Sequence, residues 1–250
     1  MSTSDPSMFI YLCGDDTAVL LLYVDDIILT GSSEYFITSL INQKKTEFAI
    51  KDLGDLYYFL GIEAQFSSSR DTLTLAQKKY IVDLLVKENM TDCKSCSTPV
   101  SSEKRVSVHN GEPLPDALDF RSLVGGLQYL TLTGPDITFV VNYISQFMHS
   151  PTTTHMLLVK RVLRYLKGTL GSGIIIQSGD ISKLTSYSDS DWDGCPDTRR
   201  STSGYCVFLG NSLVSWSSKK QPTVSKSFIE AEYKALSVLV AEVMWLSGLL

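Results

Sequence analysis

Two adjacent carboxylates, Asp25 and Asp26, have the type and spacing that most directly suggest chemistry. They follow the apolar run Leu20–Tyr23 and precede Ile27–Leu29, so they fall between two segments typical of β-strands. Carboxylates at such a turn can hold the divalent ions that activate a hydroxyl and neutralise a triphosphate in phosphoryl transfer. The alternative is a plain polar turn, but the pair lacks the glycine that a two-residue hairpin favours. We therefore predict a metal-binding hairpin.

A second acidic group, Asp189, Asp191 and Asp193, precedes Gly194. This Asp-x-Asp-x-Asp-Gly spacing is also how a calcium-binding EF-hand loop begins. Such a loop follows a helix and carries a bidentate glutamate at its twelfth position, whereas here that position is Arg200 and the preceding residues indicate a strand. The pattern argues against calcium and predicts acidic side chains at the end of a strand.

A basic stripe, defined as Lys160, Arg164 and Lys167, recurs at i, i+4 and i+7 on an expected helix, and apolar residues occupy the opposite face. The stripe is either a solvated surface or a contact for backbone phosphates. The net charge of the whole chain is -5, so any attraction to nucleic acid has to come from such a local patch.

The cysteines favour reduced thiols, because there are five of them in 250 residues and the polar start carries no secretory signal. Cys93 and Cys96 form a lone Cys-x-x-Cys pair with only His109 nearby, which disfavours zinc. The longest apolar run, Ala18–Leu29, contains both aspartates and is too short to cross a bilayer. We expect an intracellular protein, cytoplasmic or nuclear, that is not secreted and has no membrane contact.

The elements that position these residues follow from the apolar periods. A β-meander is expected over Met8–Leu29, and a polar, proline-containing linker or surface loop over 91–118. Further strands are expected at 56–66, 73–75, 174–176, 184–188, 204–209 and 213–216. Helices are expected at 33–48, 78–87, 120–132, 135–148, 153–166 and 227–250. With 44% hydrophobic and 20% charged residues, this mixture predicts a globular α+β protein with one sizeable core or two smaller ones.

The motifs also resemble the reverse transcriptase of copia-type retrotransposons. Residues 22–27, Leu-Tyr-Val-Asp-Asp-Ile, resemble its polymerase catalytic motif, and residues 51–63 resemble the stretch leading into its primer-gripping hairpin. Further blocks resemble the family in the expected order, at 77–81, 97–99, 123–125 and 161–169. The resemblance covers nearly the whole chain.

The C-terminal third is similar to the RNase H domain of the same family, block by block, at 187–194, 199–205, 216–221 and 230–236. By that match, Asp189 is the carboxylate on the opening strand and Glu232 the carboxylate on the following helix. Glu230 is the alternative, and the phase of the helix favours Glu232.

The resemblance implies four parts of the chain. Residues 1–90 would be the C-terminal palm and primer grip of a partial polymerase palm, and residues 91–119 a linker. Residues 120–172 would form thumb and connection helices, and residues 173–250 the N-terminal part of a truncated RNase H-like α/β domain.

The implied function is RNA-directed DNA polymerisation by two-metal nucleotidyl transfer, joined to RNase H. Asp25, Asp26, Asp189 and Glu232 would hold Mg²⁺, or Mn²⁺ in its place. The partners would be an RNA/DNA primer–template hybrid and deoxynucleotides, with phosphate contacts at the basic stripe. The family pattern has a further aspartate upstream of the hairpin and a further nuclease carboxylate downstream, so we expect this chain alone to be inactive. The alternative is a non-catalytic nucleic-acid-binding remnant.

Overall fold

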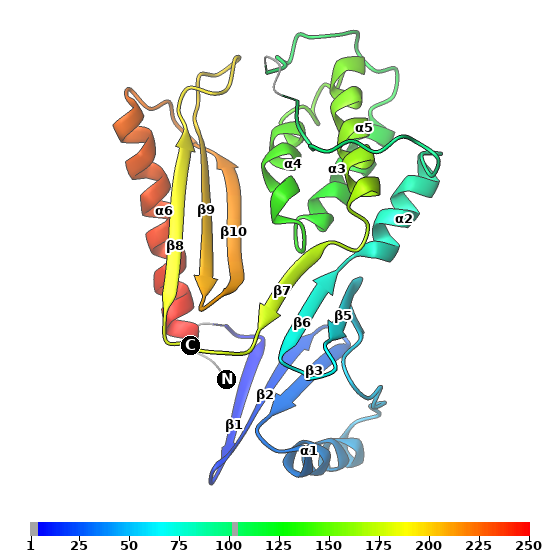
Figure 1. Cartoon of the computed structure of the whole chain (residues 1–250), viewed down its shortest axis with the longest axis vertical. Coiled ribbons are helices and arrows are strands. Elements are labelled where there is room, and N and C mark those ends of the chain that lie inside the picture. Colours follow the sequence, from blue (N-terminus) through cyan, green and yellow to red (C-terminus); the bar gives the residue numbers. More distant parts are fainter. Residues whose placement is uncertain (1–4, 102–104) are drawn as a thin grey trace. The chain divides into compact units, whose positions relative to one another are not determined.

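The structure is a computed structural model that describes residues 5–101 and 105–250. It combines helices and antiparallel sheets, which confirms the α+β class predicted from the sequence (Figure 1). The chain forms two compact units, one of residues 1–57 with 242–250 and the other of residues 58–241.

The first unit contains the predicted β-meander, with strands β1 (Met8–Cys13), β2 (Asp16–Tyr23) and β3 (Asp26–Gly31) in the order β1-β2-β3. Both connections are two-residue turns, because Cys13 pairs with Asp16 and Tyr23 pairs with Asp26. The short turns fix the register of the sheet and confirm the predicted meander.

Helix α1 (Glu34–Glu47) follows β3 and confirms the predicted helix. Ser33 is its N-cap, since the Ser33 hydroxyl accepts a hydrogen bond from the Phe36 amide at 3.3 Å. The Phe36 ring stacks on Tyr11 of β1 with 5.7 Å between the ring centroids. This contact joins the helix to the sheet that carries the carboxylate turn.

The second unit begins with an antiparallel sheet of β4 (Tyr58–Phe59), β5 (Ile62–Phe66), β6 (Thr72–Ala76) and β7 (Gly173–Gln177), in the order β4-β5-β6-β7. The prediction of one strand over 56–66 is wrong. Leu60 and Gly61 both have positive φ, 47° and 77°, and form a two-residue turn that divides the segment into a hairpin. A side chain at Gly61 would also meet Tyr129, whose hydroxyl lies 2.8 Å from the position of a Cβ.

Strand β7 pairs with β6 in this sheet, with Ile174 opposite Leu75. The pairing joins the segment after the helices to the segment before them. The sheet is therefore continuous across residue 173, where we expected a domain boundary. The four expected domain ranges stay predictions.

Four helices form the main hydrophobic core: α2 (Lys78–Lys87), α3 (Leu118–Leu130), α4 (Thr138–Ser145) and α5 (Thr153–Gly168), with a short 3-10 helix, η1 (Pro135–Ile137), leading into α4. Their apolar faces meet, and the largest fully buried apolar side chains are Phe120, Leu123, Val124, Leu127, Ile137, Val140, Val141, Ile144, Val159 and Leu163. These helices confirm the predicted ones to within a few residues at each end.

Part of the polar stretch before α3 is held against this core. The Tyr143 hydroxyl donates to the Val106 carbonyl at 2.7 Å, and the Thr152 hydroxyl donates to the Asn110 carbonyl at 2.5 Å. His155 Nε2 lies 3.2 Å from the Ser107 carbonyl. Residues 106–110 therefore form a surface loop that is fixed on α4 and α5.

The third sheet consists of β8 (Leu184–Asp191), β9 (Thr202–Leu209) and β10 (Ser212–Lys220), antiparallel in the order β10-β9-β8. Helix α6 (Phe228–Leu249) follows and runs beside the sheet (Figure 1). Val207, Ala231 and Ala235 are buried at 1% exposure or less. All four elements confirm predictions from the sequence, although each strand is longer than expected.

Candidate metal-binding carboxylates

The turn between β2 and β3 places Asp25 in the turn itself and Asp26 at the first position of β3. Of the two turn residues only Val24 has a positive φ, 50°, in the first central position, which glycine usually occupies in type II′ turns. A β-branched residue is strained in this conformation. The strained backbone belongs to the turn that presents the two carboxylates.

Both carboxylates are exposed, and no hydrogen bond or ion pair joins either of them to another described residue. The flanking strands are exposed as well, with Leu22 at 42% and Ile27 at 44%. Within their own unit, these side chains are not covered by any element of the described residues.

Asp16 cannot join Asp25 and Asp26 at one ion. Asp16 opens β2 and accepts a hydrogen bond from Ser32 at 3.2 Å, whereas Asp25 follows the far end of the same eight-residue strand. At about 3.3 Å per residue, the seven steps from Asp16 to Tyr23 place the two ends of that strand roughly 23 Å apart. Among the described residues, no three His, Cys, Asp or Glu side chains gather as metal ligands.

Asp189 lies on β8 opposite Gly204 of β9, and its side chain is exposed. The adjacent Ser190 is buried, and the side-chain amide of Gln221 reaches both the Ser190 hydroxyl, at 3.3 Å, and the Ala231 carbonyl on α6, at 2.9 Å. Because side chains alternate along a strand, Ser190 faces α6 and Asp189 faces away from it.

Contacts on the opposite face of the same sheet agree with this orientation of Asp189. Asp191 shares the face of Asp189 and forms an ion pair with Arg105, whose guanidinium lies over the Phe139 ring of α4. The Trp216 indole on that face donates to the Thr131 carbonyl at 3.1 Å. The structure therefore does not bring Asp189 and the α6 carboxylates to one face of the sheet.

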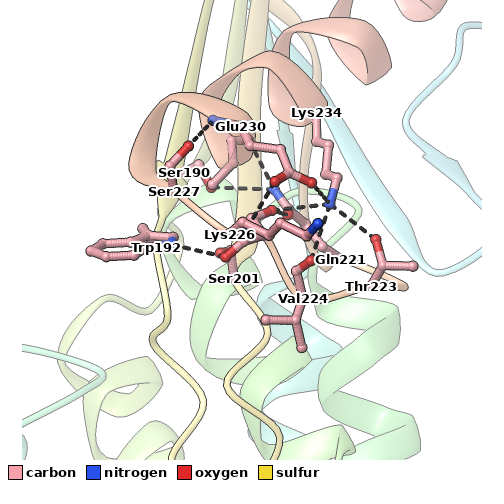
Figure 2. A network of polar contacts seen from close by, with 12 residues as sticks. Ser190, Trp192, Ser201, Gln221, Thr223, Val224, Lys226, Ser227, Glu230 and Lys234 are labelled. Atoms are coloured by element: carbon pink, nitrogen blue, oxygen red, sulfur yellow. Dashed lines mark hydrogen bonds and ion pairs between the residues drawn. The ribbon is translucent and has the colours of Figure 1, made fainter.

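The two α6 candidates differ in their partners, as Figure 2 shows for Glu230. Glu230 forms an ion pair with Lys234 at 2.8 Å and accepts a hydrogen bond from the Lys226 amide at 2.8 Å. The hydrogen bond from Lys234, together with the Lys226 amide, lowers the pKa of Glu230. Glu232 is half-buried and forms no hydrogen bond or ion pair with any described residue. Of the two candidates, it is therefore the one whose carboxylate oxygens are not already engaged by the protein.

Sequence reasoning missed the network around Gln221, which is buried at the end of β10 (Figure 2). Its amide also reaches the Ser203 hydroxyl at 2.9 Å, and its carbonyl accepts from the Ser225 hydroxyl at 2.8 Å. Lys234 extends the network to Ser225 at 3.1 Å. These bonds fix the start of α6 on β8 and β9. A lone polar residue after a strand gave no signal of this role.

Asp193 of the second acidic group is also occupied. Its carboxylate pairs with Arg199, and its φ of 59° places it in the turn after β8. Two of the three aspartates in the calcium-like pattern, Asp191 and Asp193, are therefore neutralised by arginines.

The basic stripe on α5 is partly used within the protein. Lys160 is exposed, but the Lys167 ammonium donates to the Cys93 carbonyl at 2.6 Å. The Arg164 backbone carbonyl accepts from the Cys96 amide at 3.4 Å. The stripe therefore holds the loop that contains Cys93 and Cys96, both of which are free thiols.

No helix in the described parts of the chain is long and apolar enough to cross a membrane.

Comparison with known proteins identifies the class. Residues 1–102, which contain the carboxylate hairpin, match the family described as reverse transcriptase (RNA-dependent DNA polymerase). No solved structure matches the chain.

Individual relatives define the family more narrowly. An uncharacterized mitochondrial protein of Arabidopsis thaliana is 50% identical over 229 residues, which is 92% of this chain and 94% of that protein. The retrovirus-related Pol polyprotein from transposon RE1 of Arabidopsis thaliana is 43% identical over the whole chain, which spans 17% of that polyprotein. A putative transposon Ty5-1 protein of Saccharomyces cerevisiae is 31% identical over 92% of this chain and 75% of its own length. The chain belongs to the reverse transcriptase region of copia-type retrotransposon Pol polyproteins.

Proposed function

We propose that this chain carries the catalytic hairpin of an RNA-directed DNA polymerase, with Asp25 and Asp26 as ligands of divalent ions. The observation that carries the proposal is the two-residue turn from Tyr23 to Asp26, which presents adjacent carboxylates at an exposed tip. The match of this segment to the reverse transcriptase family supports the assignment.

The donor set fits Mg²⁺, or Mn²⁺ in its place. Mg²⁺ is usually bound through one or two carboxylates together with substrate phosphates, so Asp25 and Asp26 can supply the protein's share of ligands. When bound, such ions activate the primer hydroxyl and neutralise charge on the triphosphate. The role of the chain's own residues is to fix two negative charges side by side and to leave room around them for a primer–template and a deoxynucleotide.

The remaining parts of the chain would serve the same substrate. We assign residues 1–90 to the palm and primer grip, 91–119 to a linker, 120–172 to thumb and connection helices, and 173–250 to an RNase H-like part. The partner would be an RNA/DNA hybrid. Lys160 is the member of the basic stripe best exposed for a phosphate, with Arg164 and Lys167 beside it.

A nuclease site is the second candidate function, supported by the order of the RNase H-like blocks and by the unused carboxylate of Glu232. Asp189 and Glu232 would be its ligands. These donors do not fit one Mg²⁺ site as they stand, because Asp189 and α6 lie on opposite faces of the sheet. This arrangement of the two carboxylates does not support a nuclease step.

The polymerase proposal is tested by NMR of the full chain titrated with Mn²⁺, which broadens amide signals near a bound ion. We expect selective broadening of the Val24 and Asp26 amides, and loss of this broadening in Asp25→Asn/Asp26→Asn. Asp15→Asn is the matched control, because Asp15 is an exposed aspartate in the other two-residue turn of the same sheet. Broadening that survives in the double variant would overturn the proposal.

A non-catalytic nucleic-acid-binding remnant makes a different prediction. Its binding to a primer–template hybrid would fall steeply with salt and would survive Asp25→Asn and Asp189→Asn. A primer-extension assay gives a second test. Because only two carboxylates, and no third ligand, are brought together among the described residues, we expect the pure chain to incorporate no deoxynucleotide. Mg²⁺-dependent incorporation by the pure chain would contradict this expectation.

A further inference from the structure

Cys195 lies in the connection between β8 and β9 and is buried, with 9% of its surface exposed. Its sulfur is 2.9 Å from the ammonium nitrogen of Lys220, the last residue of β10. The same ammonium donates to the Gln146 side chain at 2.9 Å, at the end of α4. The lysine is therefore held in place from two sides, with its charge directed at the thiol.

The loop after Cys195 adds further donors. It is closed by backbone hydrogen bonds from Arg199 to the Cys195 carbonyl at 2.9 Å and from Cys195 to the Arg200 carbonyl at 3.2 Å. In this closed conformation the hydroxyl and amide of Thr198 and the amide of Asp197 lie near the sulfur and favour its anionic form. The sulfur thus accepts a hydrogen bond from one charged donor, Lys220, and lies beside the polar groups of the loop.

This environment favours the thiolate. Burial raises the pKa of Cys195. The interactions with Lys220, Thr198 and Asp197 lower it by more than burial raises it, so the pKa lies below its ordinary value. The titratable and charged groups facing the sulfur are Lys220 from β10, Asp197 from the loop and Tyr143 from α4. A thiolate is the reactive form of cysteine.

A cavity of about 130 Å³ opens onto the thiol, and Lys220, Tyr143, Gln146 and Thr198 are among its lining residues. One water molecule occupies about 30 Å³ in the liquid, so the cavity has room for hydrogen peroxide or a few waters. A small peroxide therefore has space beside the thiol.

We propose that Cys195 is a modification site at which a small peroxide oxidises the thiolate to a sulfenic acid. The sulfur attacks one oxygen of hydrogen peroxide, the S–O bond forms and the O–O bond breaks. The leaving hydroxide takes a proton from the Lys220 ammonium and departs as water. The sulfur loses two electrons and the peroxide gains them. This reactivity is separate from the carboxylate hairpin, which lies in the other compact unit.

The other cysteines of the chain serve as internal controls. Cys13 is exposed on β1, where reagents reach it freely. Oxidation governed by access alone would therefore modify Cys13 before Cys195. Oxidation governed by thiolate character would reverse that order.

The full chain is treated briefly with hydrogen peroxide, the reaction is stopped with catalase, and the protein is unfolded in the presence of dimedone. Peptide mass spectrometry then gives the sulfenic acid at each cysteine. We expect Cys195 to be oxidised about tenfold faster than Cys13, in line with the effect of a neighbouring lysine on thiol reactivity. Lys220→Met should bring the rate of Cys195 down to that of Cys13 or below.

Lys219→Met is the matched control, because Lys219 is an exposed lysine on the same strand; it should leave the rate at Cys195 unchanged. The proposal is overturned if Cys195 reacts no faster than Cys13, or if folded Lys220→Met keeps the rate. Should circular dichroism show that Lys220→Met does not fold, Thr198→Val removes one donor instead. An unchanged rate in that folded variant contradicts the proposal equally.

Discussion

The helical core and the β-meander use similar apolar residues in opposite ways. In the core, Phe120, Leu123 and Ile144 have no exposed surface. In the meander and α1, Ala18 is the only buried residue of the described range 5–57, and strand residues such as Leu12 are 70% exposed. The core is closed on its own side chains, whereas the meander presents its apolar residues together with the two carboxylates.

This difference separates stability from function within one chain. The core consists mostly of apolar side chains, and residues 106–110 are hydrogen-bonded to residues of its helices and their caps. The meander gains little from burial and carries the proposed metal ligands. Substitutions should therefore affect the free energy of unfolding in the core and ligand binding in the meander.

The largest contrast is expected from matched phenylalanine truncations. Phe120→Ala removes a fully buried ring and should lower the free energy of unfolding by about 3–5 kcal/mol. Phe9→Ala, on β1 and already 38% exposed, should cost about 1 kcal/mol or less. Urea denaturation followed by circular dichroism measures both. Equal losses would show that the meander is as closely enclosed as the core.

The core should also respond to pH through His155. This ring stacks on Phe147 at 3.9 Å, and its Nδ1 accepts from the Thr152 amide at 3.0 Å while Nε2 faces the Ser107 carbonyl. Burial lowers the pKa of His155 below its ordinary value of 6.5, and the hydrogen bond that Nε2 donates to the Ser107 carbonyl opposes this shift. A protonated Nδ1 would also oppose the Thr152 amide.

The unfolded chain therefore binds a proton at His155 more readily than the folded chain does. Stability from this group is complete above pH 6.5 and falls as the pH drops below it. Unfolding midpoints in urea between pH 7.5 and 5 should show the decrease, and His155→Phe should flatten it in that window. A decrease of the same size in His155→Phe would assign the effect to other groups.

Helix caps give a smaller contrast. Thr152 caps α5 in a capping box with His155, and its replacement by alanine should cost about 1 kcal/mol or more, because the site is buried. Ser33→Ala removes the cap of α1, which has no buried residue, and should cost about 0.5 kcal/mol. Thermal unfolding compares the two. A larger loss in Ser33→Ala would reverse the ranking of the two regions.

The smallest effect is expected at the carboxylate turn. Val24→Gly relieves a positive φ, but the entropy that glycine loses on folding offsets most of this gain, so the β2–β3 hairpin should be stabilised by less than about 0.5 kcal/mol. The reciprocal change is Gly14→Val in the β1–β2 turn, where glycine has φ 58° and no neighbour within 4 Å of a Cβ. It should destabilise that hairpin by a similar amount. Amide hydrogen exchange in β2 measures both changes. Faster exchange in Val24→Gly, or unchanged exchange in Gly14→Val, would contradict the strain at Val24.

Local signals in the sequence predicted much of the fold. The apolar period gave α2 over 78–87 at the observed bounds, and the hydroxyl of Ser33 marked the start of α1. The turn at Asp25 was predictable for the same reason, since apolar strands adjoin it on both sides. Each of these features depends on residues a few positions apart.

Features set by distant residues were not predictable. Leucine disfavours positive φ, so the turn at Leu60 and Gly61 gave no sequence signal, and its contact with Tyr129 is known only from the fold. A register shift of one residue moves Asp189 from one face of β8 to the other, and periodicity cannot resolve such a shift. The ion-pair partner of Asp191 is Arg105, which is distant in the sequence, so local patterns could not predict this contact.

The pairing of β6 with β7 closes residues 77–172 into a loop of chain that contains α2 to α5. Closing so long a loop has a high entropy cost, so this pairing should form late in folding, after the local helices. Once formed, the β6–β7 pairing holds the segments before and after the helices together. A protease cut in the polar stretch between α2 and α3 should leave two fragments that stay associated through the β6–β7 pairing and the shared helical core. The fragments should separate only when the whole unit unfolds.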